Sequence, residues 1–135
     1  MRIAFGTDET TPLTGGIVDR LAGAGHQVEV LADGDPWPEA GRRVGQAVAG
    51  GSAELGIVCC WTGTGVSIAA NHAGPAVRAA LCTDAETARG ARRWNDANVL
   101  ALSLRLTTEA LAEEIVAAFL GTQPDEAERA RIERC

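Results

Sequence analysis

The sequence contains no lysine, because all 12 of its basic residues are arginines. A chain without lysine has no amine for Schiff-base chemistry and no phosphate-binding lysine of the P-loop type. Anions must therefore be bound by arginine side chains or by backbone N–H groups. The net charge of −6 and the isoelectric point near 4.8 also exclude a strongly basic surface, so nucleic acid is not an expected partner.

Histidine is scarce, and cysteine occurs without a metal-binding spacing. His26 and His72 are isolated and no CxxC or HExxH motif occurs, so we expect no metal site and a structural or exposed place for both histidines. Four cysteines in 135 residues do not make a disulfide framework, which predicts reduced thiols and a cytoplasmic protein. No apolar run reaches ~18 residues, and Met1 leads directly into a strand-like segment. Neither a membrane span nor a secretory signal is therefore expected.

Apolar segments alternate along the chain with segments of helical periodicity. Strands are expected at residues 2–6, 26–31, 55–60, 77–82 and 99–104, and helices at 12–24, 39–49, 66–73, 84–93 and 109–119. This alternation predicts one α/β domain over residues 1–135, a Rossmann-like three-layer sandwich with a five-stranded parallel sheet. Residues 124–134 predict an extra, charged C-terminal helix with little apolar face, which we expect to pack on a partner subunit.

The most informative stretch is CCWTGTGVS at residues 59–67, where an apolar strand runs into a Gly/Thr loop. Ligands bind at the carboxyl ends of parallel strands, and a Gly-rich turn before a helix presents free N–H groups to an anion. The same pattern also fits a tight turn with a buried structural cysteine, and the loop alone leaves both interpretations open. Since neighbouring strand residues point to opposite faces, Cys59 and Cys60 are expected on opposite sides of the sheet.

Three motifs together resemble the ribose-5-phosphate isomerase B / galactose-6-phosphate isomerase family: IAFGTD at 3–8, CWTGTGVSIAAN at 60–71 and NDANVLAL at 95–102. The similarity covers nearly the whole chain. The resemblance implies a dimer with active sites between its subunits, which interconverts aldose and ketose phosphates without a metal or an organic cofactor. The expected partners are thus a sugar or sugar phosphate and a second copy of the chain, with a tetramer or a heteromer with a paralogue as alternatives.

The resemblance also implies roles for single residues. Cys60 is matched to the base that moves a proton between neighbouring carbons, and Thr62 to a hydroxyl that holds the enediolate oxygens. The loop residues whose N–H groups assist it are Gly63, Thr64 and Gly65. Other residues matched to substrate-binding positions are Asp8, Asn95, Arg105, Arg129, Arg131 and Arg134. The last three do not reproduce the family's four-residue spacing, and a solvated helix face is their alternative interpretation.

Two further candidate substrate-binding residues depart from the family pattern. Glu9 replaces a histidine that faces phosphate, and Trp94 replaces the histidine thought to open the sugar ring. Because an indole is no acid–base catalyst, an open-chain or altered substrate is expected. Glu9 also fits a carboxylate that favours a helix N-terminus, while Trp94 and Trp37 fit either a dimer interface or a pocket wall.

The first functional hypothesis is therefore an aldose–ketose isomerase that moves a proton through an enediolate on a sugar phosphate or related substrate. A second hypothesis is a non-catalytic or half-site subunit of a heteromeric isomerase, because both family histidines are missing. A third is a scaffold recruited to a different proton-transfer reaction.

Overall fold

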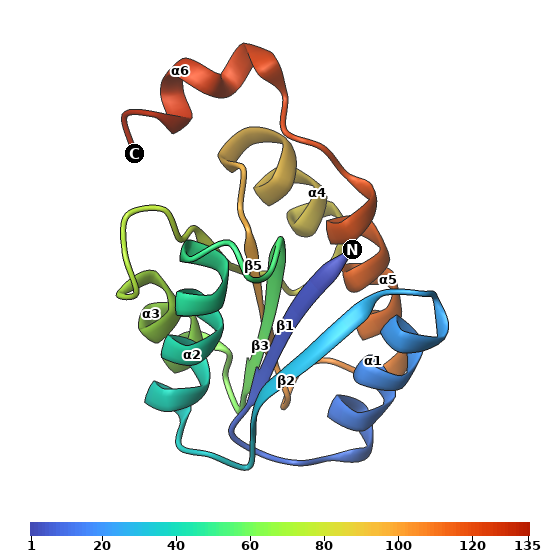
Figure 1. Ribbon diagram of the computed structural model, residues 1–135. Helices are drawn as coiled ribbons and strands as arrows, with labels where there is room; N and C mark the ends of the chain where they lie inside the picture. Colours follow the sequence, from blue (N-terminus) through green and yellow to red (C-terminus); the bar gives the residue numbers. More distant parts are fainter.

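The computed structural model describes residues 1–135 and consists of a parallel sheet between two layers of helices (Figure 1). The strands are β1 (Arg2–Thr7), β2 (Gln27–Asp33), β3 (Leu55–Cys60), β4 (Ala79–Leu81) and β5 (Val99–Ser103). The helices are α1 (Pro12–Gly23), α2 (Trp37–Ala49), α3 (Thr64–Asn71), α4 (Ala85–Asn95), α5 (Glu109–Gly121) and α6 (Arg129–Ile132). None of these helices has the length and apolar character needed to cross a membrane.

The sheet has the strand order β2-β1-β3-β5-β4, and all of its pairs are parallel. The predicted five-stranded Rossmann-like sheet is therefore confirmed. The chain winds from β1 to β2 in one direction and then crosses to β3 on the other side of β1. Thr7 pairs with Cys59 at this reversal point, so the carboxyl ends of β1 and β3 lie side by side. Open α/β sheets bind ligands at such a point.

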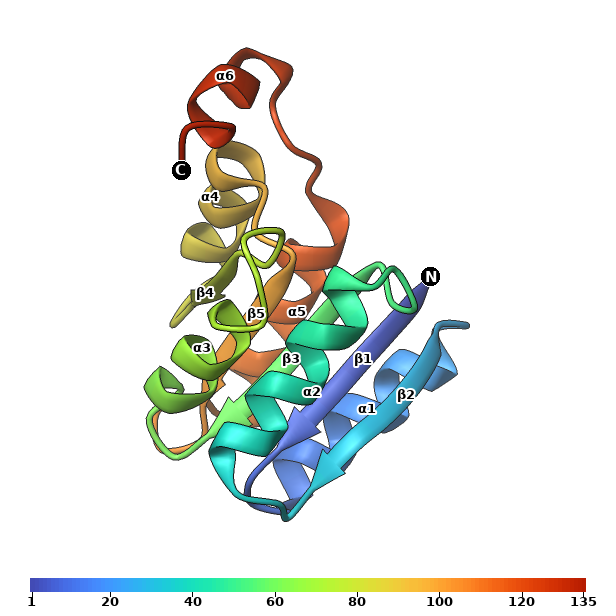
Figure 2. The ribbon, with the colours of Figure 1, turned by 60° about the vertical axis from the view of Figure 1, so that its left-hand side comes forward.

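The two helical layers bury separate apolar cores. Helices α2 and α3 cover one face of the sheet, and α1, α4 and α5 cover the other (Figure 2). Cys59 belongs to the core under α1, α4 and α5, whereas Cys60 belongs to the core under α2 and α3. The expected sidedness of these two cysteines is thus confirmed, and it follows from the two-residue period of a strand.

Most elements lie within two residues of the sequence-based expectation, and the differences at α3 and β4 have clear physical causes. Helix α3 begins at Thr64, two residues early, because Gly63 has φ of +79° and starts the helix directly after the loop. Strand β4 covers only three of the six expected residues. Side-chain amides replace part of its pairing, since Asn98 Oδ1 accepts from the N–H of Arg78 (2.7 Å) and Asn71 Oδ1 accepts from that of Ala79 (2.8 Å).

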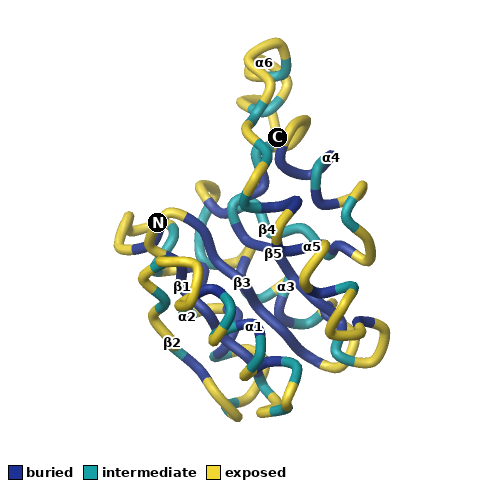
Figure 3. The backbone as a smooth tube through the Cα atoms, turned by 90° about the vertical axis from the view of Figure 1, so that its right-hand side faces the viewer, coloured by how far each residue is buried: buried dark blue, intermediate teal, exposed yellow.

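The C-terminal segment is less helical than predicted. A 3₁₀ turn at Glu126–Glu128 and the short α6 replace the continuous helix expected over residues 124–134. Isolated helices of this length are marginal without tertiary packing, and only Ile132 of α6 is partly shielded from solvent. The segment stands away from the sheet above α4 and is largely exposed (Figure 3).

Candidate active site

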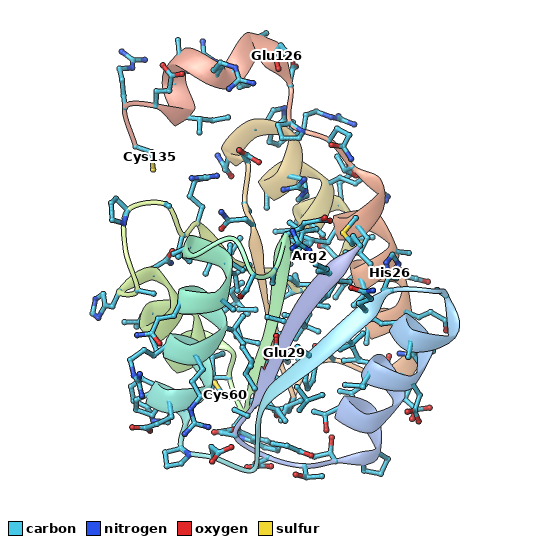
Figure 4. All side chains as sticks on the ribbon, viewed as in Figure 1. Arg2, His26, Glu29, Cys60, Glu126 and Cys135 are labelled. Carbon is cyan, nitrogen blue, oxygen red and sulfur yellow. The ribbon has the colours of Figure 1, made fainter.

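The Cys60 thiol lies at the carboxyl edge of the sheet, at the end of β3 (Figure 4). The residue is 5% exposed, so its side chain is almost wholly enclosed within one subunit. Its carbonyl accepts from the N–H of Leu104 (2.9 Å). The next carbonyl, of Trp61, accepts from the N–H of Arg105 (3.0 Å) and from the Ser103 hydroxyl (3.0 Å). Three bonds from the end of β5 therefore hold the start of the loop rigid.

Gly63 sets the entry of the loop into α3. Its φ of +79° is accessible to glycine at little cost, and a β-carbon there would lie 2.5 Å from Leu81 Cδ1 and 3.1 Å from the carbonyl oxygen of Leu102. Gly63 is the N-cap residue of α3 and has no side chain, so it cannot bond the first N–H groups of the helix. The first N–H groups of a helix have no partners within the helix, so those of α3 point at the loop and can bind negative charge.

The hydroxyls of Thr62 and Thr64 form a pair above this helix terminus. Their Oγ1 atoms are 2.7 Å apart, and the N–H of Thr64 points to Thr62 Oγ1 at 3.4 Å. Both residues are exposed. One of the two hydroxyl hydrogens lies between these oxygens, so the other is available to a ligand oxygen next to Cys60. The candidate residues Cys60, Thr62, Gly63, Thr64 and Gly65 are thus brought together by one turn.

Asp8 and Glu9 follow β1 on the neighbouring strand end. The N–H of Asp8 donates to the carbonyl of Cys59 (3.2 Å), while Asp8 Oδ1 is buried and has no hydrogen-bond partner. Burial, and then the charge of Glu9, raises the pKa of Asp8. Glu9 is exposed, and its backbone is held by two hydrogen bonds with the Thr7 hydroxyl (2.7 and 3.3 Å). The structure therefore places both carboxyls at the same edge as Cys60.

The other thiols are poor candidates for a base. Cys59 is fully buried on the far face, and burial, followed by Cys60 and Asp8, raises the pKa of its thiol. Burial, followed by Asp84, raises the pKa of Cys82 to about 11. Both therefore remain neutral at physiological pH. Cys60 is the cysteine whose side chain shares the face and the edge of the Gly/Thr loop.

The remaining candidates, apart from Arg105, lie at the opposite end of the subunit. Trp94 and Asn95 end α4, just before the start of β5, whereas Cys60 ends the parallel strand β3. Asn95 and Arg129 line a cleft of about 840 Å³ below α6, together with Cys135. In Figure 4 the C-terminal segment and Cys60 lie at opposite ends of the molecule. One subunit therefore does not join this group to the Cys60 loop.

The C-terminal arginines differ in how far they are already paired. Arg129 forms a bidentate bond with Glu126 (2.7 and 2.9 Å), and Arg131 binds Glu128 (3.0 Å). Hydrogen bonding to Arg129 and its charge lower the pKa of Glu126, so this pair stays ionised. Arg134, like Arg105 at the Cys60 edge, is exposed and forms no ion pair within the chain. These two guanidinium groups are the free ones among the candidates.

Two residues of the NDAN motif at 95–98, Asp96 and Asn98, form hydrogen bonds that hold the fold together. Asp96 has φ of +47° and its carboxylate accepts from Arg78 (3.1 Å) and from Arg92 (3.4 Å), which is buried. Asn98 bonds the backbone next to β4, as described above. Asn95 is exposed and takes no part in this network. Within the motif, Asn95 is therefore the residue left to contact a ligand.

Sequence reasoning did not assign Trp61 a place in the site. Its indole is 56% exposed and follows Cys60 directly, and Trp37 is 45% exposed and packs against Gly65. The chain has three tryptophans, no tyrosine, and two phenylalanines that are both buried. The sequence could have indicated these aromatic side chains, because the chain has few aromatic residues. Two of its tryptophans, Trp37 and Trp61, lie in or next to loops at the carboxyl edge of the sheet.

The family model described as Ribose/Galactose Isomerase matches residues 3–134. Ribose-5-phosphate isomerase B of Escherichia coli is 42% identical over 130 residues, with 90% of this chain and 85% of the relative covered. D-erythrulose-4-phosphate isomerase of Pectobacterium atrosepticum is 32% identical over 129 residues, with 91% and 84% covered.

A solved structure supports the same relationship. Ribose-5-phosphate isomerase B of Clostridium thermocellum superposes with a TM-score of 0.93 at 36% identity, and 99% of this chain and 94% of that one are covered. Fold, motifs and sequence identity agree over almost the full length. The chain therefore belongs to the ribose/galactose isomerase family.

Proposed function

We propose that this protein is an aldose–ketose isomerase that acts on a sugar phosphate. Cys60 takes a proton from the carbon next to the carbonyl and returns it to the neighbouring carbon, and the intermediate is an enediolate. The observation that carries the proposal is the position of Cys60, at the end of β3 and one short loop before the N-terminus of α3, whose N-cap is Gly63. The family membership supports the same reaction.

The loop is suited to the charge that develops in this reaction. The enediolate bears negative charge on the substrate oxygens, next to the thiol. The Thr62 hydroxyl and the N–H groups of residues 63–65 supply donors that the fold holds in place before the reaction begins. Preorganised donors of this kind stabilise an oxyanion without reorganisation.

The active unit is proposed to be a homodimer in which each subunit completes the site of the other. Within one subunit, Trp94 and Asn95 are separated from Cys60 by the length of the sheet. A second copy placed against the carboxyl edge brings its own Trp94, Asn95 and C-terminal arginines to the loop. The exposed C-terminal segment, which stands clear of its own sheet, fits this arrangement.

The phosphate is proposed to bind the two unpaired arginines, Arg105 of one subunit and Arg134 of the other. Arg129 and Arg131 contribute less, because Glu126 and Glu128 already neutralise them. Asp8, Glu9 and Asn95 contact sugar hydroxyls. The reaction as proposed uses no metal and no organic cofactor, and the four free thiols support a reducing compartment, the cytoplasm.

The substrate is proposed to be an open-chain sugar phosphate. Trp94 stands where the resembled family has a ring-opening histidine, and an indole does not exchange protons near neutral pH. A tetrose 4-phosphate needs no ring opening, since its O4 carries the phosphate and cannot close a furanose. The relative from Pectobacterium is named for such a four-carbon compound.

Isomerisation in deuterated water tests the proposal. The protein is incubated with D-erythrose 4-phosphate and with D-ribose 5-phosphate, and ketose formation and carbon-bound deuterium are followed by NMR. We expect turnover of the tetrose phosphate, and loss of at least about 100-fold in Cys60→Ala. Cys59→Ala is the matched control, because that thiol lies on the other face of the sheet and its removal leaves the activity in place.

Absence of ketose and of deuterium uptake with every sugar phosphate, or equal activity in the parent and Cys60→Ala, contradicts the proposal. Faster turnover of ribose 5-phosphate than of the tetrose phosphate contradicts only the open-chain preference. Sedimentation of the active protein as a monomer contradicts the shared site.

A further inference from the structure

Asp8 carries the one buried side-chain nitrogen or oxygen of the chain that lacks a hydrogen-bond partner. The atom is Oδ1, at the end of β1 where the winding of the sheet reverses. A buried carboxylate oxygen without a partner lowers stability, and folding alone does not require it. Its place beside the Cys60 loop points instead to a role in the chemistry of the site.

The proposed isomerisation moves a proton on oxygen as well as on carbon. Conversion of an aldose to a ketose transfers hydrogen from C2 to C1, removes the hydrogen of O2 and adds one to O1. The Cys60 thiol accounts for the carbon step. The oxygen step needs a second group that donates and accepts a proton near neutral pH.

Few groups can supply that step. The Thr62 hydroxyl does not ionise near neutral pH. His26 lies at the other edge of the sheet, where its Nδ1 is 3.1 Å from the N-terminal ammonium (Figure 4), and His72 follows the far end of α3. At the carboxyl edge, the other aspartates are already engaged: Asp33 with the Thr10 hydroxyl, Asp35 with Arg43, and Asp84 with the N–H of Thr87. The carboxyls of Asp8 and Glu9 remain.

Asp8 is the better suited of the two carboxyls. Burial and the neighbouring charge of Glu9 raise its pKa, so the protonated form is more populated at neutral pH than in an ordinary aspartate. Glu9 is exposed, and only its backbone is held, by Thr7. Glu9 therefore acts through Asp8, as a neighbouring negative charge that disfavours ionisation of the Asp8 carboxyl.

We infer that Asp8 relays the proton between O1 and O2 of the substrate, a role that rests on the proposed function of the Cys60 site. The Cys60 thiolate takes the C2 hydrogen as a proton, and the Asp8 carboxyl donates its proton to O1, which yields the enediol. The Asp8 carboxylate then takes the O2 proton while the Cys60 thiol returns a proton to C1. C2–O2 becomes the new carbonyl, both side chains regain their starting states, and no co-reactant is consumed.

Asp8→Asn separates the two proton transfers. In deuterated water, we expect the kcat of ketose formation to fall about 10²–10⁴-fold, the effect of losing a general acid–base, while KM changes less than about threefold. Deuterium still enters C2 of the recovered aldose, because Cys60 continues to exchange the carbon-bound proton. Glu9→Gln lowers kcat less than Asp8→Asn does. Asp19→Asn, an exposed position on α1, is the matched control.

The role is overturned if Asp8→Asn keeps ketose formation within about threefold of the parent. It is equally overturned if exchange at C2 and ketose formation fall in the same proportion, since that result assigns Asp8 to binding alone. A parent protein that shows neither exchange nor ketose overturns the proposed function itself, and the relay with it. The far-UV circular dichroism of each variant verifies that the fold is intact.

Discussion

The indole of Trp37 lies against the backbone of Gly65, so closely that a β-carbon at residue 65 would be 2.9 Å from Cδ2 and Cε3 of the ring. Trp37 opens α2 between two prolines, and Gly65 belongs to the first turn of α3. The contact joins the two helices at the edge where Cys60 lies. An aromatic ring in this position supports the N–H groups that we propose as oxyanion donors.

Gly65→Ala is therefore expected to disturb the loop. The new methyl group displaces either the indole or the first turn of α3, which lowers kcat and costs about 1–3 kcal/mol of unfolding free energy. Urea unfolding and isomerase assays measure the two effects. Trp37→Ala in the same chain should relieve the clash, so that the double variant is more stable than the two single losses predict. Gly15→Ala on α1, where nothing lies within 4 Å, should be neutral or stabilising.

Gly63→Ala is expected to be more damaging than Gly65→Ala. The left-handed backbone costs about 1–2 kcal/mol for a residue with a side chain, and the contact with Leu81 adds about 1–3 kcal/mol of overpacking. Gly25→Ala isolates the first contribution, because Gly25 has φ of +92° with open space around it. Equal losses in the two variants, measured by urea unfolding, would refute the packing contribution at residue 63.

The sheet and the place of Cys60 were predictable because both depend on local patterns. Apolar runs alternating with helical periodicity specify a parallel sheet, and the period of two puts Cys59 and Cys60 on opposite faces. The missing partner of Asp8 Oδ1 was not predictable, since it depends on atoms from separate segments. The resemblance placed Asn95 and Cys60 in one site, but it could not show that a single subunit holds them at opposite ends.

Within the motif at residues 95–98, Asp96→Ala should lower stability, whereas Asn95→Ala should weaken substrate binding. Loss of Asp96 removes the carboxylate partner of Arg78 and of the buried Arg92, and we expect a loss of about 2 kcal/mol, the usual worth of hydrogen bonds to charged groups. Asn95→Ala should leave the unfolding free energy within about 0.5 kcal/mol and raise KM. Thermal melts measure the stability of each variant, and enzyme kinetics measure its KM. A loss of stability in Asn95→Ala would contradict the inference that the Asn95 side chain makes no contact within the chain.

Arg134→Ala should affect phosphate recognition more than Arg129→Ala does. Arg134 has no ion pair, whereas the Arg129 guanidinium is occupied by Glu126 at 2.7 Å. We expect KM for a sugar phosphate to rise about tenfold or more in Arg134→Ala, as the loss of one charge-assisted bond predicts, and to change little in Arg129→Ala. Glu126→Gln frees Arg129 and should lower KM. The reverse ranking of the two arginines would assign the phosphate to Arg129.

Asp8→Asn is expected to stabilise the protein at neutral pH while it reduces activity. The folded state raises the pKa of Asp8, so this side chain favours folding only where it is protonated in both states. That contribution is complete below the unfolded value of about 3.9 and is lost as pH rises through the higher folded value. The facing titratable groups are Glu9 and Cys59, and Cys59 stays neutral throughout this range. The Tm of Asp8→Asn should therefore match the parent near pH 4 and exceed it increasingly toward pH 7.

The gain in Tm should shrink in a Glu9→Gln background, because that substitution removes part of the shift in the pKa of Asp8. A Tm below that of the parent at every pH would mean that the Asp8 carboxylate stabilises the fold, and the orphaned oxygen would then need another explanation.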